Sequence, residues 1–289
     1  MNNSELIRYK DILLKILAAF IKICEENNLQ YFCAGGTLIG AVRHHGFIPW
    51  DDDLDFFMPR KDYDRLEEIM LDRSEYKVIS IFNSNGLATF KKIYDCNTTL
   101  WEYKQIPFIY GVYLDIFPLD ETVDNKQGFL KKYKTLRNLC RLYQISQMKT
   151  SLTDLIGFIK DKKRNFLVKG VLSILVSSCL KSYYRKKIIT YEKELANSKK
   201  GDHLASYYGD YWDKEYLKRS WFDDYIEMPF EHLKVRACKG YDGYLSRLYG
   251  DYMKLPPIEK QVTHHYHYYL NMDKGMDINE VLNILKRKK

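Results

Sequence analysis

Apolar residues recur at helical spacing near the start of the chain, and this pattern predicts an amphipathic helix over residues 5–27. Two further helices are expected, one over 37–45 with Thr37 as its N-cap and Gly46 as its stop, and one over 61–71. Shorter apolar runs bounded by turn residues predict strands over 31–34, 54–58, 77–82, 90–95 and 112–117. Helices mixed with strands predict an α/β (α+β) fold, with a mixed sheet and flanking helices.

The middle of the chain has a different pattern, which is helical and strongly basic. Residues 126–200 contain 19 basic and 4 acidic residues, a net charge of +15, whereas residues 1–125 carry −7 and residues 201–289 carry no net charge. We therefore predict a basic helical insertion over 126–200. It would separate the N-terminal part of a catalytic core, residues 1–125, from an aromatic-rich C-terminal part, residues 201–289.

Residues 166–180 of this insertion form an apolar run with basic residues on both sides. The run is too short and too interrupted to span a bilayer, which takes roughly 18 or more uncharged apolar residues. A basic-flanked apolar helix can lie in the membrane interface, which predicts peripheral contact through residues 160–190. The alternative is a helical subdomain with a buried apolar face and solvated lysines. We see no nucleic-acid-binding motif, so nucleic acid is not an expected partner.

Cysteine usage and the N-terminal segment bear on the compartment. The six cysteines form no C-x-x-C pair and no metal-ligand spacing, and the N-terminus does not resemble a signal peptide. Both observations predict reduced thiols in a cytoplasmic protein, located at the inner face of the membrane where the peripheral contact forms.

The most informative acidic residues lie in the segment 51–55. Asp53 and Asp55 are two positions apart at the start of a predicted strand, and side chains at that spacing share one face. Adjacent carboxylates repel each other, and a divalent cation between them removes that cost. Mg²⁺ prefers such hard oxygen ligands. The pair alone is also compatible with a solvated acidic turn or a calcium loop.

A third carboxylate strengthens the metal interpretation. Asp115 is a single charge inside an apolar strand pattern, where an unpaired carboxylate would be costly. Beside Asp53 and Asp55 it would complete a site for one or two metal ions.

The glycines that precede this acidic segment fit a phosphate-binding turn. Gly35 and Gly36 would let the backbone approach a phosphate, and the helix that begins near Thr37 would direct N–H groups at it. Arg43 could add a contact to a phosphate oxygen. The order of these features is an apolar strand, two glycines, a short helix, a D-x-D pair and an isolated strand aspartate. This order is the signature of the nucleotidyltransferase superfamily, so we predict a nucleotidyltransferase-like core.

Longer blocks of sequence agree, in order, with the motifs of one family within this superfamily. They are Gly36–Arg43, Gly46–Asp55, Pro59–Tyr63, Leu114–Asp120, Tyr249–Met253, Pro256-Pro257, Glu259-Lys260 and His264-His265. These blocks resemble the LicD family, which includes bacterial phosphocholine transferases and is related to fukutin and the fukutin-related protein. The matching blocks run from about residue 31 to residue 265, but residues 126–200 match no motif of the family.

The resemblance implies an activity and a set of site residues. Family members transfer phosphocholine or a polyol phosphate from a CDP-linked donor to a sugar hydroxyl. The acceptors are often lipid-linked glycans, such as lipopolysaccharide or teichoic-acid precursors. By position, Asp53, Asp55 and Asp115 are the expected ligands of Mg²⁺ or Mn²⁺, and Asp51 is a further acidic residue of the family. Phosphocholine from CDP-choline is the transfer that we expect.

The remaining roles are hypotheses. Arg43 and Lys260 are candidates to stabilise phosphate charge, and His264 is a candidate for substrate binding. Asp51 is the first choice for a general base because it lies beside the metal ligands, and His44 and His264 are the other candidates.

Two other functions stay open. The first is a true nucleotidyltransferase, which would move a nucleoside monophosphate from a nucleoside triphosphate and release pyrophosphate. The second is a non-catalytic protein that binds glycans or membranes. The block Ile48–Asp51 disfavours the first function, and the presence of all three expected metal ligands disfavours the second.

Overall fold

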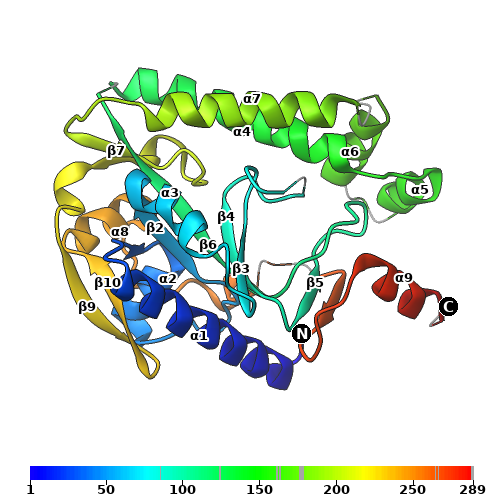
Figure 1. Cartoon of the computed structure of the whole chain (residues 1–289), viewed down its shortest axis with the longest axis horizontal. Helices are drawn as coiled ribbons and strands as arrows, with labels where there is room; N and C mark the ends of the chain where they lie inside the picture. The colour runs from blue at the N-terminus through cyan, green and yellow to red at the C-terminus, as the bar shows by residue number, and fades with distance from the viewer. Residues whose placement is uncertain are drawn as a thin grey trace.

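The structure is a computed structural model that describes residues 1–84, 86–123, 125–160, 162, 164–175, 179–263, 265 and 267–287. Its centre is a twisted, mixed sheet in the strand order β1-β2-β6-β4-β3, and β7 and β8 extend it from the far end of β6 (Figure 1). Its strands are β1 (Phe32–Cys33), β2 (Asp55–Pro59), β3 (Tyr76–Ile79), β4 (Lys91–Asp95), β6 (Tyr113–Thr122), β7 (His203–Ala205) and β8 (Tyr216–Lys218). The predicted α/β class and mixed sheet are confirmed.

The parallel pair at the centre of the sheet positions the site. β2 and β6 run parallel, whereas β1 pairs with β2, and β4 pairs with β6, in the antiparallel direction. Two antiparallel ribbons lie outside the sheet, β9 (Tyr225–Phe230) with β10 (Leu233–Cys238) and β5 (Thr99–Trp101) with β11 (Tyr269–Asn271). The second ribbon joins residues about 170 positions apart in the sequence, so the C-terminal segment returns to the core.

Helices of the core cover this sheet. α1 (Asn3–Glu26) contacts β4 and β6, and α3 (Arg60–Ile69) contacts β2 and β6. The side chain of Asn2 caps α1 together with Glu5, and a stripe of apolar side chains around Leu13 and Phe20 is buried. The remaining core helices are α2 (Gly35–Ile39), α8 (Tyr241–Tyr249), α9 (Ile278–Arg287) and short turns η1 (Gly40–His44), η2 (Trp212–Glu215), η3 (Arg219–Trp221) and η4 (Ile258–Lys260).

The helix predicted over 37–45 differs from the structure at both ends. It begins at Gly35 rather than after Thr37, and Ala34 precedes it without a side-chain cap. The Thr37 hydroxyl instead accepts a hydrogen bond from the Asp55 N–H at 2.8 Å. Residue His45, with φ +57°, ends the helix in the left-handed conformation that we assigned to the glycine after it. The prediction that Thr37 caps this helix is therefore wrong, because a neighbouring strand uses its hydroxyl.

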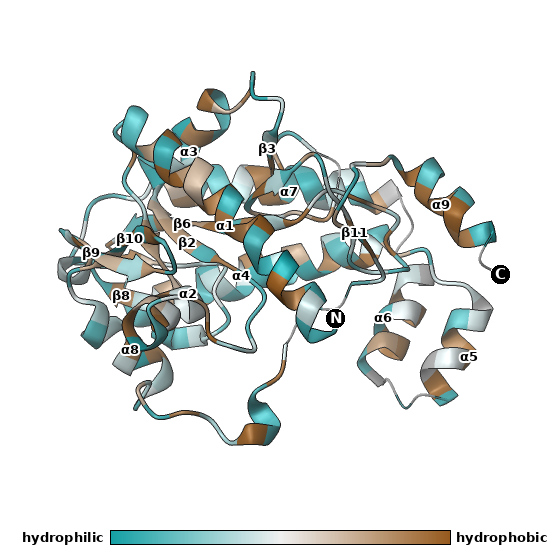
Figure 2. Cartoon of the chain, turned by 90° about the horizontal axis from the view of Figure 1, so that it is seen from below, coloured by the Kyte–Doolittle hydropathy of each residue, from teal (hydrophilic) through white to brown (hydrophobic). Residues whose placement is uncertain are grey.

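The segment between the two parts of the core is helical, in agreement with its pattern. It contains α4 (Lys126–Gln147), α5 (Leu152–Lys160), α6 (Arg164–Leu175) and α7 (Cys179–Ala196). α4 and α7 lie side by side and bury a second apolar cluster around Phe129, Tyr133 and Leu136. α5 and α6 pack on each other and stand away from the sheet (Figure 2). In the part of the chain that the structure describes, no helix is long and apolar enough to span a bilayer.

Candidate active site

Neighbouring strands place two of the predicted aspartates side by side. Asp55 of β2 pairs in parallel register with Asp115 of β6. Because paired residues of adjacent strands project to the same face, both carboxylates lie on one face of the sheet. Hydrogen bonds fix the backbone there: the Asp115 N–H donates to the Leu54 carbonyl, and the Asp55 N–H donates to the Thr37 hydroxyl, both at 2.8 Å.

Two glycines make room for the carboxylates at the turn between β1 and α2. A Cβ on Gly36 would lie 2.8 Å from Oδ2 of Asp51, and a Cβ on Gly35 would lie 3.5 Å from Oδ2 of Asp55. Gly35 also has φ +48°, in the left-handed region that favours glycine. A larger residue at position 36 would push against Asp51, and one at position 35 would be strained by its backbone conformation, so the Gly35-Gly36 pair belongs to the same structural unit as the aspartates.

The carboxylates of this cluster repel one another. Burial, and then the charge of Asp53, raise the pKa of Asp51 to about 8. Burial is also the largest cause that raises the pKa of Asp53, Asp55 and Asp115, and nearby carboxylates add to the rise in each case. A buried group of like charges favours any partner that brings positive charge, either a proton or a metal cation.

Two cationic side chains already contact the cluster. The Lys92 ammonium on β4 lies 2.6 Å from Oδ1 of Asp115, its antiparallel partner in the sheet. The His265 ring donates from Nδ1 to Asp52 at 2.9 Å, and its Nε2 lies 3.6 Å from Oδ2 of Asp53. The hydrogen bond to Asp52 is the main cause that raises the pKa of His265 to about 9. His265 is therefore an imidazolium at neutral pH and ties the C-terminal segment to the acidic loop.

The chemistry of the donors fits a hard divalent cation. Asp53, Asp55 and Asp115 offer carboxylate oxygens from two adjacent strands, and their raised pKa values show that the negative charge is not fully compensated. Among the described residues, no three acidic, histidine or cysteine side chains are already gathered in a metal-coordinating arrangement. Lys92 contacts Oδ1 of Asp115, so Oδ2 is the oxygen that Asp115 would offer to a metal ion.

The cluster opens onto a cavity of about 450 Å³. Its acidic wall is made by Asp51, Asp53, Asp55 and Asp115, together with Gly35, Gly36 and His265. The opposite walls come from residues 206–211, 215 and 244–249, which follow the helical insertion in the sequence. The cavity thus combines both parts of the core.

Aromatic side chains dominate the walls that face the aspartates. Phe90 packs against Phe117, with ring centroids 4.5 Å apart, and against Tyr208 at 5.5 Å. On another part of the wall, Tyr211 packs edge-on against Tyr249 at 5.0 Å. All five rings line the cavity, and none of them is fully buried. Aromatic faces of this kind attract organic cations.

A buried carboxylate lies among these rings. Glu215 is 2% exposed and lines the cavity, and its Oε1 accepts a hydrogen bond from the Tyr211 N–H at 3.2 Å. Among the described residues, its Oε2 accepts no hydrogen bond. Burial raises the pKa of Glu215 to about 7. A cation in the cavity would stabilise the ionised form of this side chain.

Other predicted residues lie away from this cavity. Arg43 donates to the carbonyls of Tyr252 at 2.6 Å and Lys254 at 3.4 Å, so its guanidinium holds the C-terminal segment. Lys260 is exposed at the end of η4, and neither side chain is among the described residues that line the cavity. His44 accepts a hydrogen bond from Arg43 and packs edge-on against Trp50. The predicted roles of Arg43 and Lys260 in phosphate binding stay predictions.

His264 lies outside the described residues, so its predicted role also stays a prediction. Sequence analysis missed the parts of the site that lie far apart in the chain. The sequence indicated nothing about Lys92 beyond its place in a predicted strand. Tyr208, Tyr211 and Glu215 belong to the C-terminal part of the core, which the sequence analysis described only as rich in aromatic residues. Their contribution depends on the way that the chain after the insertion folds back onto β2 and β6.

Comparison with known proteins gives consistent results. Residues 28–152 match the family model described as LicD/FKTN/FKRP, nucleotidyltransferase domain. The lipopolysaccharide cholinephosphotransferase LicD of Haemophilus influenzae is 32% identical over 271 residues, which cover 88% of this chain and 93% of that protein. An uncharacterized protein of Rickettsia typhi is 30% identical over 113 residues, which cover 39% of this chain and 36% of that protein.

Proposed function

The chain belongs to the LicD family of transferases, and we propose that it transfers phosphocholine from CDP-choline to a hydroxyl group of lipopolysaccharide or a related cell-surface glycan. The Haemophilus relative is named for phosphocholine transfer to lipopolysaccharide, and it aligns with nearly the whole chain.

One observation carries the proposal. The carboxylates of Asp53, Asp55 and Asp115 share a cavity of about 450 Å³ with aromatic side chains and the buried Glu215. The acidic wall suits a metal-bound diphosphate, whereas aromatic rings beside a carboxylate suit a quaternary ammonium group. CDP-choline carries both groups in one molecule. A donor with an uncharged polyol in place of choline would not use the cation-binding part of the cavity.

Asp53, Asp55 and Asp115 would hold Mg²⁺ or Mn²⁺, which when bound supplies charge neutralisation at the phosphates of the donor. Asp51 is the candidate general base, because it lines the cavity beside the aspartates that would hold the metal ion. In the transfer, the acceptor oxygen forms a bond to the phosphorus of phosphocholine, and its proton passes to Asp51. The bond from that phosphorus to the oxygen of CMP breaks, and CMP leaves with the electron pair.

A donor screen tests the reaction class. Protein with Mg²⁺ and a lipopolysaccharide acceptor is incubated with CDP-choline, CDP-ethanolamine, CDP-glycerol, CDP-ribitol or CTP, and the release of CMP and of pyrophosphate is followed. We expect CMP from CDP-choline, and its loss in Asp55→Asn but not in Asp11→Asn, which removes an exposed carboxylate on α1. Pyrophosphate from CTP would instead establish a nucleotidyltransferase.

Metal binding is tested without any substrate. Thermal unfolding is compared in EDTA and in Mg²⁺ or Mn²⁺ for the wild type, Asp53→Asn and Asp11→Asn. A ligand at 100 times its Kd stabilises the folded state by about 2.7 kcal/mol, so the wild type and Asp11→Asn are expected to gain and Asp53→Asn is not. An equal gain in all three proteins would remove the aspartates from the metal proposal.

We also propose that α5 and α6 contact the membrane that carries the acceptor. Their apolar side chains Ile156, Ile159, Val168 and Val171 are 44–62% exposed, and the basic Lys160 and Lys162 lie close by in the sequence. An exposed apolar surface with basic neighbours favours anionic lipid. The protein should float with anionic vesicles and less so with neutral ones, and Ile159→Asp should weaken flotation whereas Ile7→Asp on α1 should not. Equal flotation of both variants would overturn this contact.

A further inference from the structure

A second cavity, of about 590 Å³, adjoins the candidate active site. The two cavities share the wall residues Phe90, Tyr208, Gly209 and Asp210. Most of the other residues that line the second cavity lie on α4 and α6, two helices of the basic insertion. The proposed reaction does not use this second cavity, although the cavity borders the aromatic wall of the candidate active site.

Positive charge is concentrated on these walls. Arg137, Arg141 and Lys169 line the cavity, and its only described carboxylate is Asp210, which already pairs with Arg137 at 2.8 Å. Within the described residues, neither Arg141 nor Lys169 forms an ion pair with a carboxylate. Burial, and then the charge of Arg141, lower the pKa of Lys169. The two cations therefore lie close enough to repel each other across space that no described acidic side chain fills.

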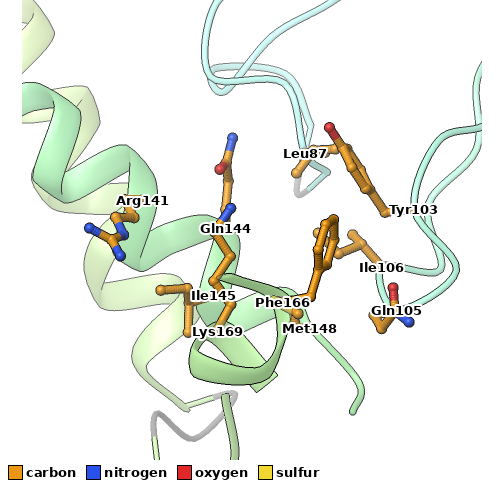
Figure 3. A pocket seen from close by; sticks show the side chains of 10 residues that line it. All are labelled: Leu87, Tyr103, Gln105, Ile106, Arg141, Gln144, Ile145, Met148, Phe166 and Lys169. Atoms are coloured by element: carbon orange, nitrogen blue, oxygen red, sulfur yellow. The ribbon is translucent and has the colours of Figure 1, made fainter. Parts of the chain in front are cut away.

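These same residues connect the cavity to a third, smaller hollow of about 130 Å³. Arg141, Gln144 and Lys169 line both spaces. Figure 3 shows these three side chains on the helices, and Leu87, Tyr103 and Ile106 on the loops across from them. The positive pair thus lies between this small hollow and the second cavity, with Arg141 exposed and Lys169 half-buried.

We propose that Arg141 and Lys169 bind a phosphate group on the acceptor glycan and hold the acceptor beside the catalytic carboxylates. Two neighbouring cations without an acidic partner match the charge of about −2 on a phosphate monoester at neutral pH. An arginine offers it a planar pair of donors, and a lysine adds a point charge. The assignment of this phosphate to the acceptor glycan rests on the proposed function, whereas the phosphate site itself does not.

Pyridoxal 5′-phosphate is a suitable probe because it reports on a lysine beside a phosphate site. The lysine amine forms an imine with the aldehyde and releases water, borohydride reduces the imine to a stable amine, and mass spectrometry locates the label. We expect preferential labelling of Lys169 over Lys131, an exposed lysine on α4 that lines none of the three cavities. Pyridoxal, which lacks the phosphate, should show no such preference.

The arginine is tested in the same assay. Arg141→Gln should lower the phosphate-dependent labelling of Lys169 about tenfold, the size of a lost charge-assisted hydrogen bond. Arg65→Gln, on an exposed part of α3, should leave it unchanged. Equal labelling of Lys169 and Lys131, or of Lys169 by pyridoxal and its phosphate, would overturn the site.

Protection experiments decide what the site is for. Glucose 6-phosphate should protect Lys169 from labelling and glucose should not, because the site recognises a phosphorylated sugar. CDP-choline with Mg²⁺ should protect poorly, because its phosphates belong at the aspartates. Protection by CDP-choline alone would assign the cavity to the donor and overturn the acceptor role. This labelling assay needs no turnover, so its result is independent of whether the donor screen succeeds.

Discussion

Strand β6 carries two carboxylates, five residues apart, that have opposite electrostatic surroundings: Asp120 is buried and Asp115 is partly buried. Asp120 is 1% exposed and receives two hydrogen bonds from Arg60, at 2.6 and 2.9 Å. The same guanidinium contacts Glu192 of α7 at 3.2 Å, and the hydroxyl of Tyr208 donates to that carboxylate. Asp115 has a single cation, Lys92, and lies against other carboxylates instead.

This difference in charge compensation distinguishes a structural cluster from a functional one. Although burial disfavours the Arg60 cation, Asp120 and Glu192 raise its pKa well above the usual range, so this group is held together by its own charges. In the active-site cluster, burial and repulsion instead raise the pKa of four carboxylates, those of Asp51, Asp53, Asp55 and Asp115. The ion-paired cluster around Arg60 joins α3, β6 and α7 and stabilises the fold. The aspartate cluster is under-compensated, and it can bind a cation that arrives with the substrate.

The largest effect on stability is expected at the paired cluster. Arg60→Ala leaves Asp120 and Glu192 buried without their partner, and breaking a buried pair in this way costs about 3–5 kcal/mol. Urea unfolding measures the loss. Arg65→Ala on the same helix, whose side chain is 44% exposed, should cost less than about 1 kcal/mol. Equal stability of the two variants would remove the contrast between the clusters.

At the under-compensated cluster the expected effect is on activity. Asp55→Asn should lower kcat/KM roughly 10²- to 10³-fold, because it removes a charge that the transition state needs. Its metal-free stability should be unchanged or higher, because one source of repulsion is gone. Asp120→Asn should behave in the opposite way, with a loss of stability and a smaller loss of activity per folded molecule. If both variants lose mainly stability, the Asp55 cluster is structural.

The pH dependence of folding stability at Glu215 further tests the contrast between paired and under-compensated carboxylates. Its pKa is about 7 in the folded state, compared with the ordinary value of 4.5, because burial disfavours its charge. As the pH rises, Glu215 therefore loses its proton at a lower pH in the unfolded state than in the folded state. The stability that the protonated carboxyl contributes below pH 4.5 is lost as the pH rises to 7. The loss amounts to about 3 kcal/mol.

The measurement compares urea unfolding of the wild type and Glu215→Gln at pH 5 and pH 7.5. The variant should lose less stability over this interval, because a neutral amide replaces the titrating group. Asp51 titrates in both proteins, so the difference between them isolates Glu215. Parallel pH profiles would show that Glu215 already has a compensating partner.

Local patterns indicated which carboxylates would gather in the acidic half of the candidate site. The D-x-D spacing placed Asp53 and Asp55 on one face, and the apolar pattern around Asp115 marked a strand with a misplaced charge. The sequence could not show that β2 and β6 are parallel neighbours, because strand order depends on packing over the whole core. The resemblance to the family supplied that step.

The aromatic half of the candidate site could not be predicted from the sequence, for a physical reason. β7 and β8 are three residues long, so they carry almost no periodicity, and the rings of Tyr208, Tyr211 and Tyr249 come together only through tertiary contacts. Arg43 also makes a long-range contact that local patterns did not indicate. Its guanidinium donates to the carbonyl of Tyr252, which is 209 residues away, and its predicted role in phosphate binding stays a prediction.

The smallest expected effect concerns Thr37, which connects the glycine turn to the acidic strand. Its buried hydroxyl accepts the hydrogen bond from the Asp55 N–H, so Thr37→Val leaves a buried donor without a partner. We expect a cost of about 1–2 kcal/mol in urea unfolding. Because the bond also fixes the backbone of Asp55, kcat should fall in Thr37→Val but recover in Thr37→Ser, which keeps the hydroxyl. A stability loss confined to Thr37→Ser would point to the lost methyl packing, and an unchanged kcat in Thr37→Val would separate Thr37 from the positioning of the acidic cluster.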